Sequence, residues 1–198
     1  MLFQAAVNVL NEDDEAKVVF ISPKRLDIIP TPIHHMKRID LEKHAKRFVL
    51  HYTSSAEDLL TFLATQHTQK VYPRAIIIDD LDVFMRGIQD SFESVGKTLI
   101  MAQILAQLFD YSHYCAERTG KPCYSFLATN MPSEDKYEPC YEVSSIPTLA
   151  SFHYDVLNVS KINSLSKEQH FLVDGNQLEI VFYPFSNELF LENVRKKE

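Results

Sequence analysis

The sequence predicts an α/β fold in which a mostly parallel sheet is followed by an antiparallel β extension. The first observation is the unbroken apolar run Ala75–Ile78. So short a run is typical of a strand that helices cover on both faces of a parallel sheet. The second is that strand-like and helix-like segments alternate before residue 130, and the third is that the last part of the chain alternates apolar and polar residues between turn signals. The 198 residues, 45% of them apolar, are expected to form a single domain, 1–198.

Apolar spacing and boundary residues define the elements expected before residue 130. Ser55 followed by Asp58 is similar to a capping box at the start of a helix. The longest helical pattern is expected to end near Gly120, before Pro122. The expected elements are, in chain order, a helix over 2–10, a buried strand over 18–21, a short polar helix over 41–46, a strand over 47–52, a helix from 55 through 63, the strand 75–78, a helix over 99–117 and a buried strand over 123–128.

The last third of the chain is expected to be organised differently. Residues 131–147 form a long loop that contains three prolines and is acidic, and loops of this length are usually functional or disordered. Residues 152–192 alternate apolar and polar positions, which predicts an antiparallel β ending. Its hairpins are expected at Asp174-Gly175 and near Ser186-Asn187.

Composition restricts the function classes. The net charge of -7 leaves no global basic field that would draw the protein to nucleic acid or anionic lipid, so any DNA contact must be local. Three cysteines without CxxC spacing favour reduced thiols inside the cell. No leader and no apolar run of membrane length is found, so we expect no membrane partner.

Two carboxylates follow the central strand directly. Asp79 and Asp80 come after Ile78, at the carboxyl end of the strand. Ligands bind at this edge of open α/β sheets, and an aspartate that ends such a strand holds the magnesium ion in Walker-type nucleotide folds. The alternative is a buried strand that simply stops at charged residues.

Four stretches together resemble a RecA-family recombinase paralogue. They are Leu2–Val7, Val18–Pro23, the Tyr52–Ser55 turn with the helix after it, and Ile76–Leu81. Within that family the chain is similar to the small ATPase-like partner of the SWIM-domain zinc protein, the two forming the metazoan Shu complex of homologous recombination. The likeness covers nearly the whole chain.

The resemblance implies a RecA-like P-loop ATPase core with the C-terminal antiparallel β extension. It implies a recombination mediator subunit that stabilises recombinase filaments on single-stranded DNA during DNA repair in the nucleus, with weak or no ATP hydrolysis. The implied partners are the SWIM-domain zinc protein, a RecA-family recombinase and single-stranded DNA, and the implied cofactors are ATP and magnesium, bound weakly or not at all. The alternative is an active DNA-stimulated ATPase whose Walker A lies upstream of this sequence.

The phosphate-binding motif is the main departure from that family. A P-loop needs G-x-x-x-x-G-K-[ST], because its glycines let backbone N–H groups close around the phosphates. None of the four glycines lies near a strand-to-helix junction before residue 80. Since the motif directly precedes the helix matching 2–10 in the family, we expect the first strand and the P-loop to be missing. Gly96-Lys97-Thr98 is similar to half of the motif, but Ser91 stands where its first glycine is needed, so we expect an exposed helix start there.

The resemblance also implies roles for other residues. The strand 18–21 runs into Ser22-Pro23-Lys24-Arg25, where RecA-like ATPases place a glutamate that orients the attacking water. Thr129 and Asn130 resemble the polar pair that senses the γ-phosphate, and the alternative is a polar strand end that opens a loop. The loop after them corresponds to the DNA-binding loop of recombinases, yet it is acidic here, which argues against strong DNA binding through it.

One concentration of cationic residues is a candidate contact for single-stranded DNA. It consists of Lys37, Arg38, Lys43, Lys46 and Arg47. Because acidic residues are interleaved with them, a solvated helix face is the alternative explanation. The eight histidines are scattered without the spacing of a zinc site, so we expect no metal centre built from them.

Overall fold

The computed structural model describes residues 2–27, 37–86 and 94–129, together with the backbone of four strands after residue 158. The chain divides into two compact units, the first within 1–27 and 39–154 and the second within 28–38 and 155–198. Each unit is described by itself. In the described part of the chain, no helix is both long and apolar enough to cross a membrane.

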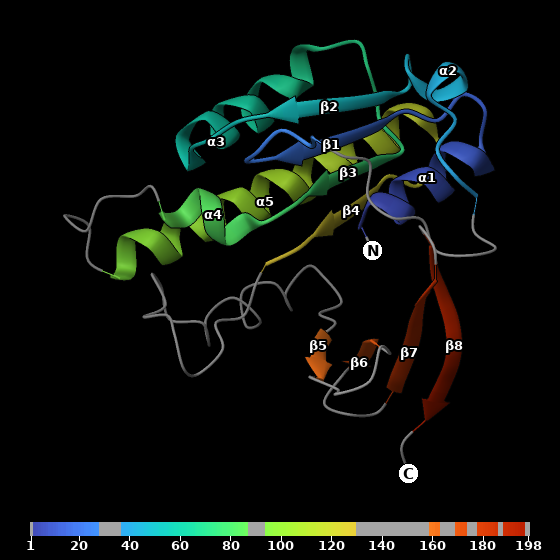
Figure 1. Ribbon diagram of the computed structural model, residues 1–198. Helices are drawn as coiled ribbons and strands as arrows, with labels where there is room; N and C mark the ends of the chain where they lie inside the picture. Colours follow the sequence, from blue (N-terminus) through green and yellow to red (C-terminus); the bar gives the residue numbers. More distant parts are fainter. Residues whose placement is uncertain are drawn as a thin grey trace. The chain divides into compact units, whose positions relative to one another are not determined.

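The first unit contains a parallel sheet with helices between its strands (Figure 1). Its strands are β1 (Val18–Ser22), β2 (Phe48–Tyr52), β3 (Ala75–Ile78) and β4 (Tyr124–Leu127). Its helices are α1 (Leu2–Glu12), α2 (Leu41–His44), α3 (Ala56–Thr65), the 3-10 turn η1 (Gln66–Thr68), α4 (Leu81–Arg86) and α5 (Ser94–Thr119). The strands lie in the order β2-β1-β3-β4, and every neighbouring pair is parallel. The predicted mostly parallel α/β sheet is therefore confirmed.

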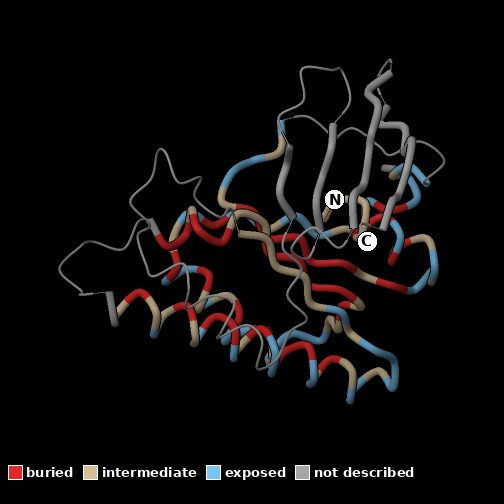
Figure 2. The backbone as a smooth tube through the Cα atoms, turned by 90° about the horizontal axis from the view of Figure 1, so that it is seen from below, coloured by how far each residue is buried: buried red, intermediate tan, exposed pale blue. Residues whose placement is uncertain are grey.

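The two central strands form the core of this unit. All four residues of β3 are fully buried, and all five of β1 are buried as well, which Figure 2 shows as red backbone. The reason is their unbroken apolar sequence, because a strand covered on both faces buries every side chain regardless of direction. Ala75–Ile78 is thus the interior strand that its sequence predicts.

Helix α1 covers one face of the sheet. Its buried residues Ala6, Val9 and Leu10 pack in one cluster with alternate residues of β1 and β3. Phe3 adds edge-to-face ring contacts with Phe20 and Phe48, at centroid distances of 6.2 and 5.4 Å. Figure 1 shows α3 and α5 on the opposite side of the sheet. The sheet therefore has the two helical layers that a parallel sheet requires.

Local signals at helix ends are confirmed. Ser55 has extended backbone angles, and its hydroxyl accepts a hydrogen bond of 3.0 Å from the N–H of Asp58, so it is the N-cap of α3. Gly120 takes a φ of 65° just after α5, and its N–H donates to the carbonyl of Ala116 at 2.9 Å. This left-handed residue ends the helix and turns the chain toward β4.

Three details differ from the sequence-based expectations. Strand β4 is not buried, and Tyr124 is 43% exposed, because β4 is an outer strand of the described sheet. Helix α5 begins at Ser94 instead of near residue 99, so Gly96-Lys97-Thr98 lies inside it. Lys97 is only 6% exposed, which corrects the expected exposed helix start. Lysines are rarely buried to this degree unless they are paired, and Lys97 has an interaction partner of its own.

The second unit contains an antiparallel sheet in the order β5-β6-β7-β8. Its strands are β5 (Val159–Ile162), β6 (Gln169–Val173), β7 (Leu178–Phe185) and β8 (Glu188–Lys196). The predicted antiparallel ending is therefore confirmed for these strands. The turn residues 174–175 and 186–187 lie outside the described residues, as does the acidic loop 131–147, but the strands that flank both turns pair as expected.

Candidate functional site

The acidic pair lies at the carboxyl edge of the sheet and is fixed there by backbone hydrogen bonds. The N–H of Asp79 donates to the carbonyl of Ile21 at the end of β1, at 2.9 Å. The N–H of Leu81 donates to the carbonyl of Ala128 just after β4, also at 2.9 Å. The backbone of the turn is thus tied to the strands on both sides of β3.

Asp80 makes the turn from strand to helix. Its φ of 54° lies in the left-handed region, which aspartate tolerates better than most residues. Its carbonyl accepts the N–H of Val83 at 2.9 Å, so α4 begins directly after it. A non-glycine residue held in this conformation is a recurrent feature of functional sites.

Asp79 is electrostatically perturbed. Burial raises the pKa of its carboxyl group above the ordinary value of 3.8, and the neighbouring charge of Asp80 raises it further. The ionised form is therefore held at a cost, which a bound cation would relieve. Perturbed carboxylates at a ligand-binding edge are candidates for function.

The carboxylate pair fits a magnesium ion that is carried by a nucleotide. Magnesium is commonly held by one or two carboxylates together with substrate phosphates and waters. Asp79 and Asp80 supply that number of carboxylates, and no group of three or more metal-ligating side chains occurs among the described residues. These residues would therefore hold magnesium together with phosphates, and not as a closed metal centre of their own.

The phosphate side of such a site has no matching cradle in the described residues. Gly96-Lys97-Thr98 lies within the helical backbone of α5, with the Lys97 side chain buried. At the end of β1, Ser22 is buried, and its hydroxyl accepts the N–H of Lys24 at 3.5 Å. Lys24 and Arg25 are exposed there, so the position where a water-orienting glutamate is expected is basic.

Of the predicted sensor pair, the structure describes one member. Thr129 follows β4 and is partly buried, with an interaction partner of its own. It comes directly after Ala128, whose carbonyl anchors the acidic turn. Asn130 lies outside the described residues, so the pair stays a prediction.

The residues of the predicted cationic cluster fall in both units of the chain. Lys37 and Arg38 belong to the second unit, whereas Lys43, Lys46 and Arg47 belong to the first. Lys43 pairs with Asp14 at 2.8 Å, and Lys46 is exposed. A role of these residues in DNA binding stays a prediction.

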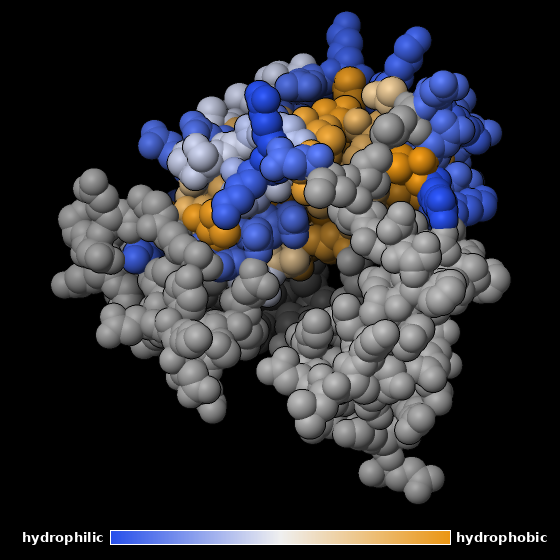
Figure 3. All heavy atoms as spheres, in the orientation of Figure 1, coloured by the Kyte–Doolittle hydropathy of each residue, from blue (hydrophilic) through white to orange (hydrophobic). Residues whose placement is uncertain are grey.

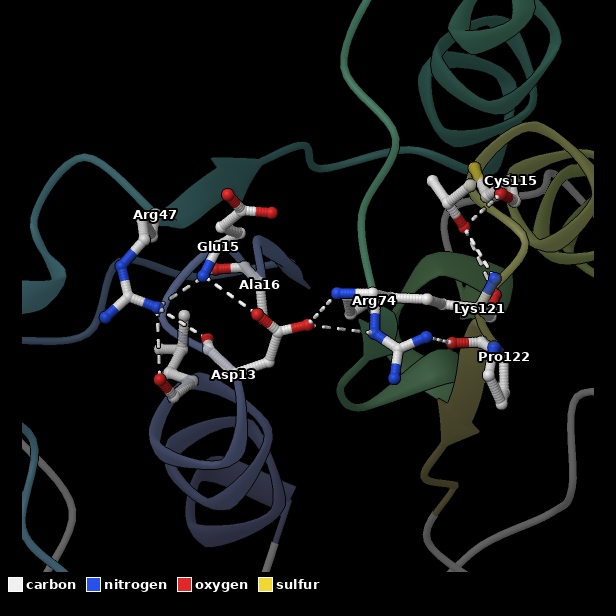
Figure 4. A network of polar contacts seen from close by, with 10 residues as sticks. Asp13, Glu15, Ala16, Arg47, Arg74, Cys115, Lys121 and Pro122 are labelled. Atoms are coloured by element: carbon white, nitrogen blue, oxygen red, sulfur yellow. Dashed lines mark hydrogen bonds and ion pairs between the residues drawn. The ribbon is translucent and has the colours of Figure 1, made fainter.

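The side chain of Arg47 is held by contacts with backbone carbonyls of the first unit (Figure 4). Its Nη1 donates to the carbonyls of Leu10, Asp13 and Ala16, at 3.0, 3.1 and 3.2 Å, and its side chain is only 13% exposed. These carbonyls lie at the end of α1 and in the turn before β1. Arg47 therefore satisfies backbone acceptors that would otherwise be left unpaired.

A second polar group at the amino ends of the strands was not predicted. Asp13 accepts a hydrogen bond of 2.8 Å from Lys121 and lies 4.0 Å from Arg74, which in turn donates to the carbonyl of Pro122 (Figure 4). Arg74 immediately precedes β3, and the other residues lie in the segments that lead into β1 and β4. They stabilise the edge opposite to the acidic turn, and their separation along the chain, 108 residues between Asp13 and Lys121, explains why no local pattern indicated them.

The outer edge of β2 is apolar and lies beside a pocket. Val49, Leu50 and Tyr52 are 42, 38 and 37% exposed, and Figure 3 shows apolar side chains gathered over β1 and β2. The pocket has a volume of about 540 Å³ and is open to solvent. His51 stacks on Phe62 at its wall, with ring centroids 3.8 Å apart. The pocket is lined by Pro23, Arg25, His51, Tyr52, Thr53, Ser54, Asp58, Thr61 and Phe62.

Comparison with known proteins identifies the fold. The chain is similar to the crystal structure of the RadB recombinase, with a TM-score of 0.57 and 13% sequence identity over 96% of this chain and 84% of that chain. No family model matches the sequence. No significant match is found among curated proteins. The chain therefore has a RecA-like fold, and at this identity the likeness concerns the fold alone.

Proposed function

We propose that this chain is a recombination mediator subunit, which supports recombinase filaments on single-stranded DNA in homologous-recombination repair and hydrolyses ATP weakly or not at all. The observation that carries the proposal is the carboxyl edge of a RecA-like sheet, where the acidic turn is built but the end of β1 is basic. An edge that can hold a cation but lacks a water-orienting carboxylate suits binding better than hydrolysis.

Magnesium and ATP are the ligands proposed for the acidic turn. Asp79 and Asp80 would hold magnesium, which supplies positive charge to the phosphates when it is bound. Thr129 directly follows Ala128, whose carbonyl holds the acidic turn. It is the residue that we propose would contact a phosphate oxygen. Weak binding is expected because two carboxylates repel phosphates unless the ion lies between them.

Protein partners are proposed for the apolar edge of β2. An outer strand with three exposed apolar side chains is a surface at which another protein can pair or pack. We assign it to the RecA-family recombinase or to the SWIM-domain zinc protein, in the nucleus. The recombinase is tested first because it is the component whose filament this chain would stabilise.

A DNA-stimulated ATPase is the second candidate function. The left-handed Asp80 and the raised pKa of Asp79 favour it, because both are features of a ligand site that is maintained at an energetic cost. It would require a Walker A motif upstream of residue 1. Hydrolysis of ATP by a chain extended upstream, stimulated by single-stranded DNA and lost in Asp79→Ala, would establish it.

Nucleotide binding is tested by titrating a fluorescent ATP analogue with magnesium against the wild type, Asp79→Ala and Glu57→Ala. Glu57 is an exposed acid on α3 and serves as the matched control. Saturable binding that is lost in Asp79→Ala and kept in Glu57→Ala supports the site. Binding that is equal in all three proteins contradicts it.

The mediator role is tested by the rate at which a RecA-family recombinase leaves single-stranded DNA, with and without this chain. We expect slower dissociation with the wild type and a reduced effect with Val49→Asp. Leu99→Asp, at a 58% exposed apolar position of α5, is the control and should act like the wild type. An unchanged dissociation rate with the wild type would exclude the mediator role.

A further inference from the structure

The pocket beside β2 lies at the carboxyl ends of β1 and β2, the edge of an open α/β sheet at which ligands bind. Three segments line it, namely the turn after β1, the end of β2 with the turn that follows, and α3. The N–H of Thr53 donates to the carbonyl of Ser22 at 3.3 Å, so the two strand ends are held together. The volume of about 540 Å³ is within the range of small-molecule sites. Asp79 and Asp80 do not line the pocket, so it is separate from the acidic turn.

Two aromatic rings form part of the pocket wall. His51, near the end of β2, stacks on Phe62 of α3 with ring centroids 3.8 Å apart and ring planes 22° apart, and both residues line the pocket. Burial lowers the pKa of His51 below the ordinary value of 6.5, so at neutral pH the imidazole is an uncharged aromatic surface. A planar ring that enters the pocket can therefore stack there, as nucleobases do on aromatic side chains.

Two adjacent cations follow β1 at this pocket. Arg25 lines it, Lys24 precedes Arg25, and both residues are exposed. Among the described residues, no acid forms an ion pair with either of them. The chain as a whole carries a net charge of -7, so this is a local concentration of positive charge. A ligand that stacks in the pocket and carries a phosphate would be attracted by both features.

Hydrogen-bonding groups complete the lining. Thr53 is only 8% exposed, and its buried hydroxyl has no hydrogen-bond partner among the described residues. Native proteins leave few buried polar groups unpaired, so we expect a ligand atom or a water to bond to it. Asp58 adds an exposed carboxylate, which accepts hydrogen bonds. A nucleobase carries donors and acceptors along its edge, whereas an apolar side chain does not, so the lining fits a nucleobase better.

We propose that the pocket beside β2 binds a nucleotide of single-stranded DNA, with the base against His51 and Phe62 and the phosphates at Lys24 and Arg25. Cations along the backbone and aromatic rings for the bases are the two components of single-strand binding. The inference rests on the proposed function in taking single-stranded DNA as the source of the nucleotide. Its test contains neither recombinase nor ATP, so its failure would leave the mediator role and the acidic turn untouched, and a failed recombinase assay would not remove the pocket's ligand.

The test measures the binding of a short fluorescent oligothymidine to the full chain by fluorescence anisotropy at several salt concentrations. Each phosphate of a single strand that a cation neutralises contributes about -0.7 to the slope of log affinity against log salt concentration, so two cations predict a slope of about -1.4. Lys24→Ala/Arg25→Ala changes two exposed residues and should lower the affinity about tenfold at low salt and bring the slope close to zero. Lys70→Ala, at an exposed cation after η1, is the matched control and should bind like the wild type.

A second set of measurements tests the base. His51→Ala removes one ring of the wall and should weaken binding about tenfold while it leaves the salt slope unchanged, and a thermal melt checks that the variant is folded. Thymidine monophosphate should compete with the strand, whereas ribose phosphate, which has no base, should compete about tenfold less well. Ultraviolet cross-linking of the oligothymidine should label a peptide that contains His51 or Phe62.

Four results would each overturn the proposal. The wild type would show no saturable binding at low salt, or the double variant Lys24→Ala/Arg25→Ala would bind as tightly as the wild type, which would place the strand elsewhere on the chain. Equal competition by ribose phosphate and thymidine monophosphate would show a site for simple anions. Thymidine monophosphate that binds as tightly as the strand would show a site for a free nucleotide. Because the double variant changes only exposed side chains, the proposal stays testable even if His51→Ala does not fold.

Discussion

The ionised carboxylate of Asp79 lowers the stability of the folded chain. Because its pKa is raised in the folded chain, the folded state binds the proton more tightly than the unfolded state, whose value is near 3.8. The stability contributed by the protonated form is present below that value and is lost as pH rises through the folded pKa. At neutral pH the charged carboxylate therefore opposes folding.

We expect Asp79→Asn to melt at a higher temperature than the wild type at pH 7. The difference should shrink as the pH falls through the folded pKa toward 3.8, because the wild-type carboxyl group then becomes protonated in the folded state and increasingly so in the unfolded state. Thermal melts of the two proteins between pH 4 and pH 7 measure it. A wild type that is the more stable protein at pH 7 would show that Asp79 is not strained by its environment.

Arg47 has the opposite role, because it stabilises the chain at a position that its sequence context presents as basic surface. Arg47→Ala removes three charge-assisted, partly buried hydrogen bonds to backbone carbonyls, and we expect a loss of about 2–3 kcal/mol in the free energy of unfolding. Lys46→Ala, at the exposed neighbouring position, should change it by less than about 0.5 kcal/mol. Urea unfolding of both variants measures the two values. Equal effects would mean that the carbonyl contacts do not matter.

At the scale of elements, what the sequence could predict depends on how local each cause is. The strand Ala75–Ile78 and the cap at Ser55 were correctly predicted, because both features are determined by residues that are close together in the sequence. Helix α4 was not predicted. It depends on the left-handed conformation of Asp80, and the residue types around position 80 do not predict that conformation. The contacts of Asp13 with Lys121 and Arg74 join residues far apart in the chain, so only the folded sheet brings them together.

The cap of α3 gives an element-scale prediction. Ser55→Ala removes the acceptor for the N–H of Asp58, and we expect a loss of about 1 kcal/mol. Ser54→Ala is the matched control because it removes a hydroxyl one residue earlier that caps nothing in the described contacts. Urea unfolding compares them. A loss for Ser54→Ala as large as that for Ser55→Ala would show that the stabilisation does not come specifically from the Ser55 hydroxyl.

For the molecule as a whole, the sheet separates two kinds of polar chemistry. Arg47, Asp13 and Arg74 brace the amino ends of the strands, where they satisfy carbonyls and one another. Asp79 and Asp80 occupy the carboxyl ends, where one carboxylate is strained by burial and by its neighbour. One edge thus contributes stability, and the other has the features of a ligand site. This division could be anticipated from the parallel fold, although the residues of the bracing edge could not.

Two histidines in the first unit make its stability depend on pH in a predictable direction. Burial lowers the pKa of His44 and of His51 below the ordinary value of 6.5. Below pH 6.5 these histidines become protonated in the unfolded chain while they stay neutral in the folded chain. The free energy of unfolding therefore decreases as the pH is lowered, until the pH is below the folded pKa values. Above pH 6.5 both states are neutral at these positions, and the effect vanishes.

We expect the wild type to lose stability between pH 7.5 and pH 5.5, and the double variant His44→Gln/His51→Gln to lose less over the same interval. His113→Gln, at an exposed position of α5, is the control and should follow the wild type. Urea unfolding of the three proteins at the two pH values gives one difference for each protein. Because each protein is compared with itself, any loss of packing from the substitutions cancels. If the double variant and the wild type lose the same amount, other groups govern the acid sensitivity and these two rings are not held neutral by the fold.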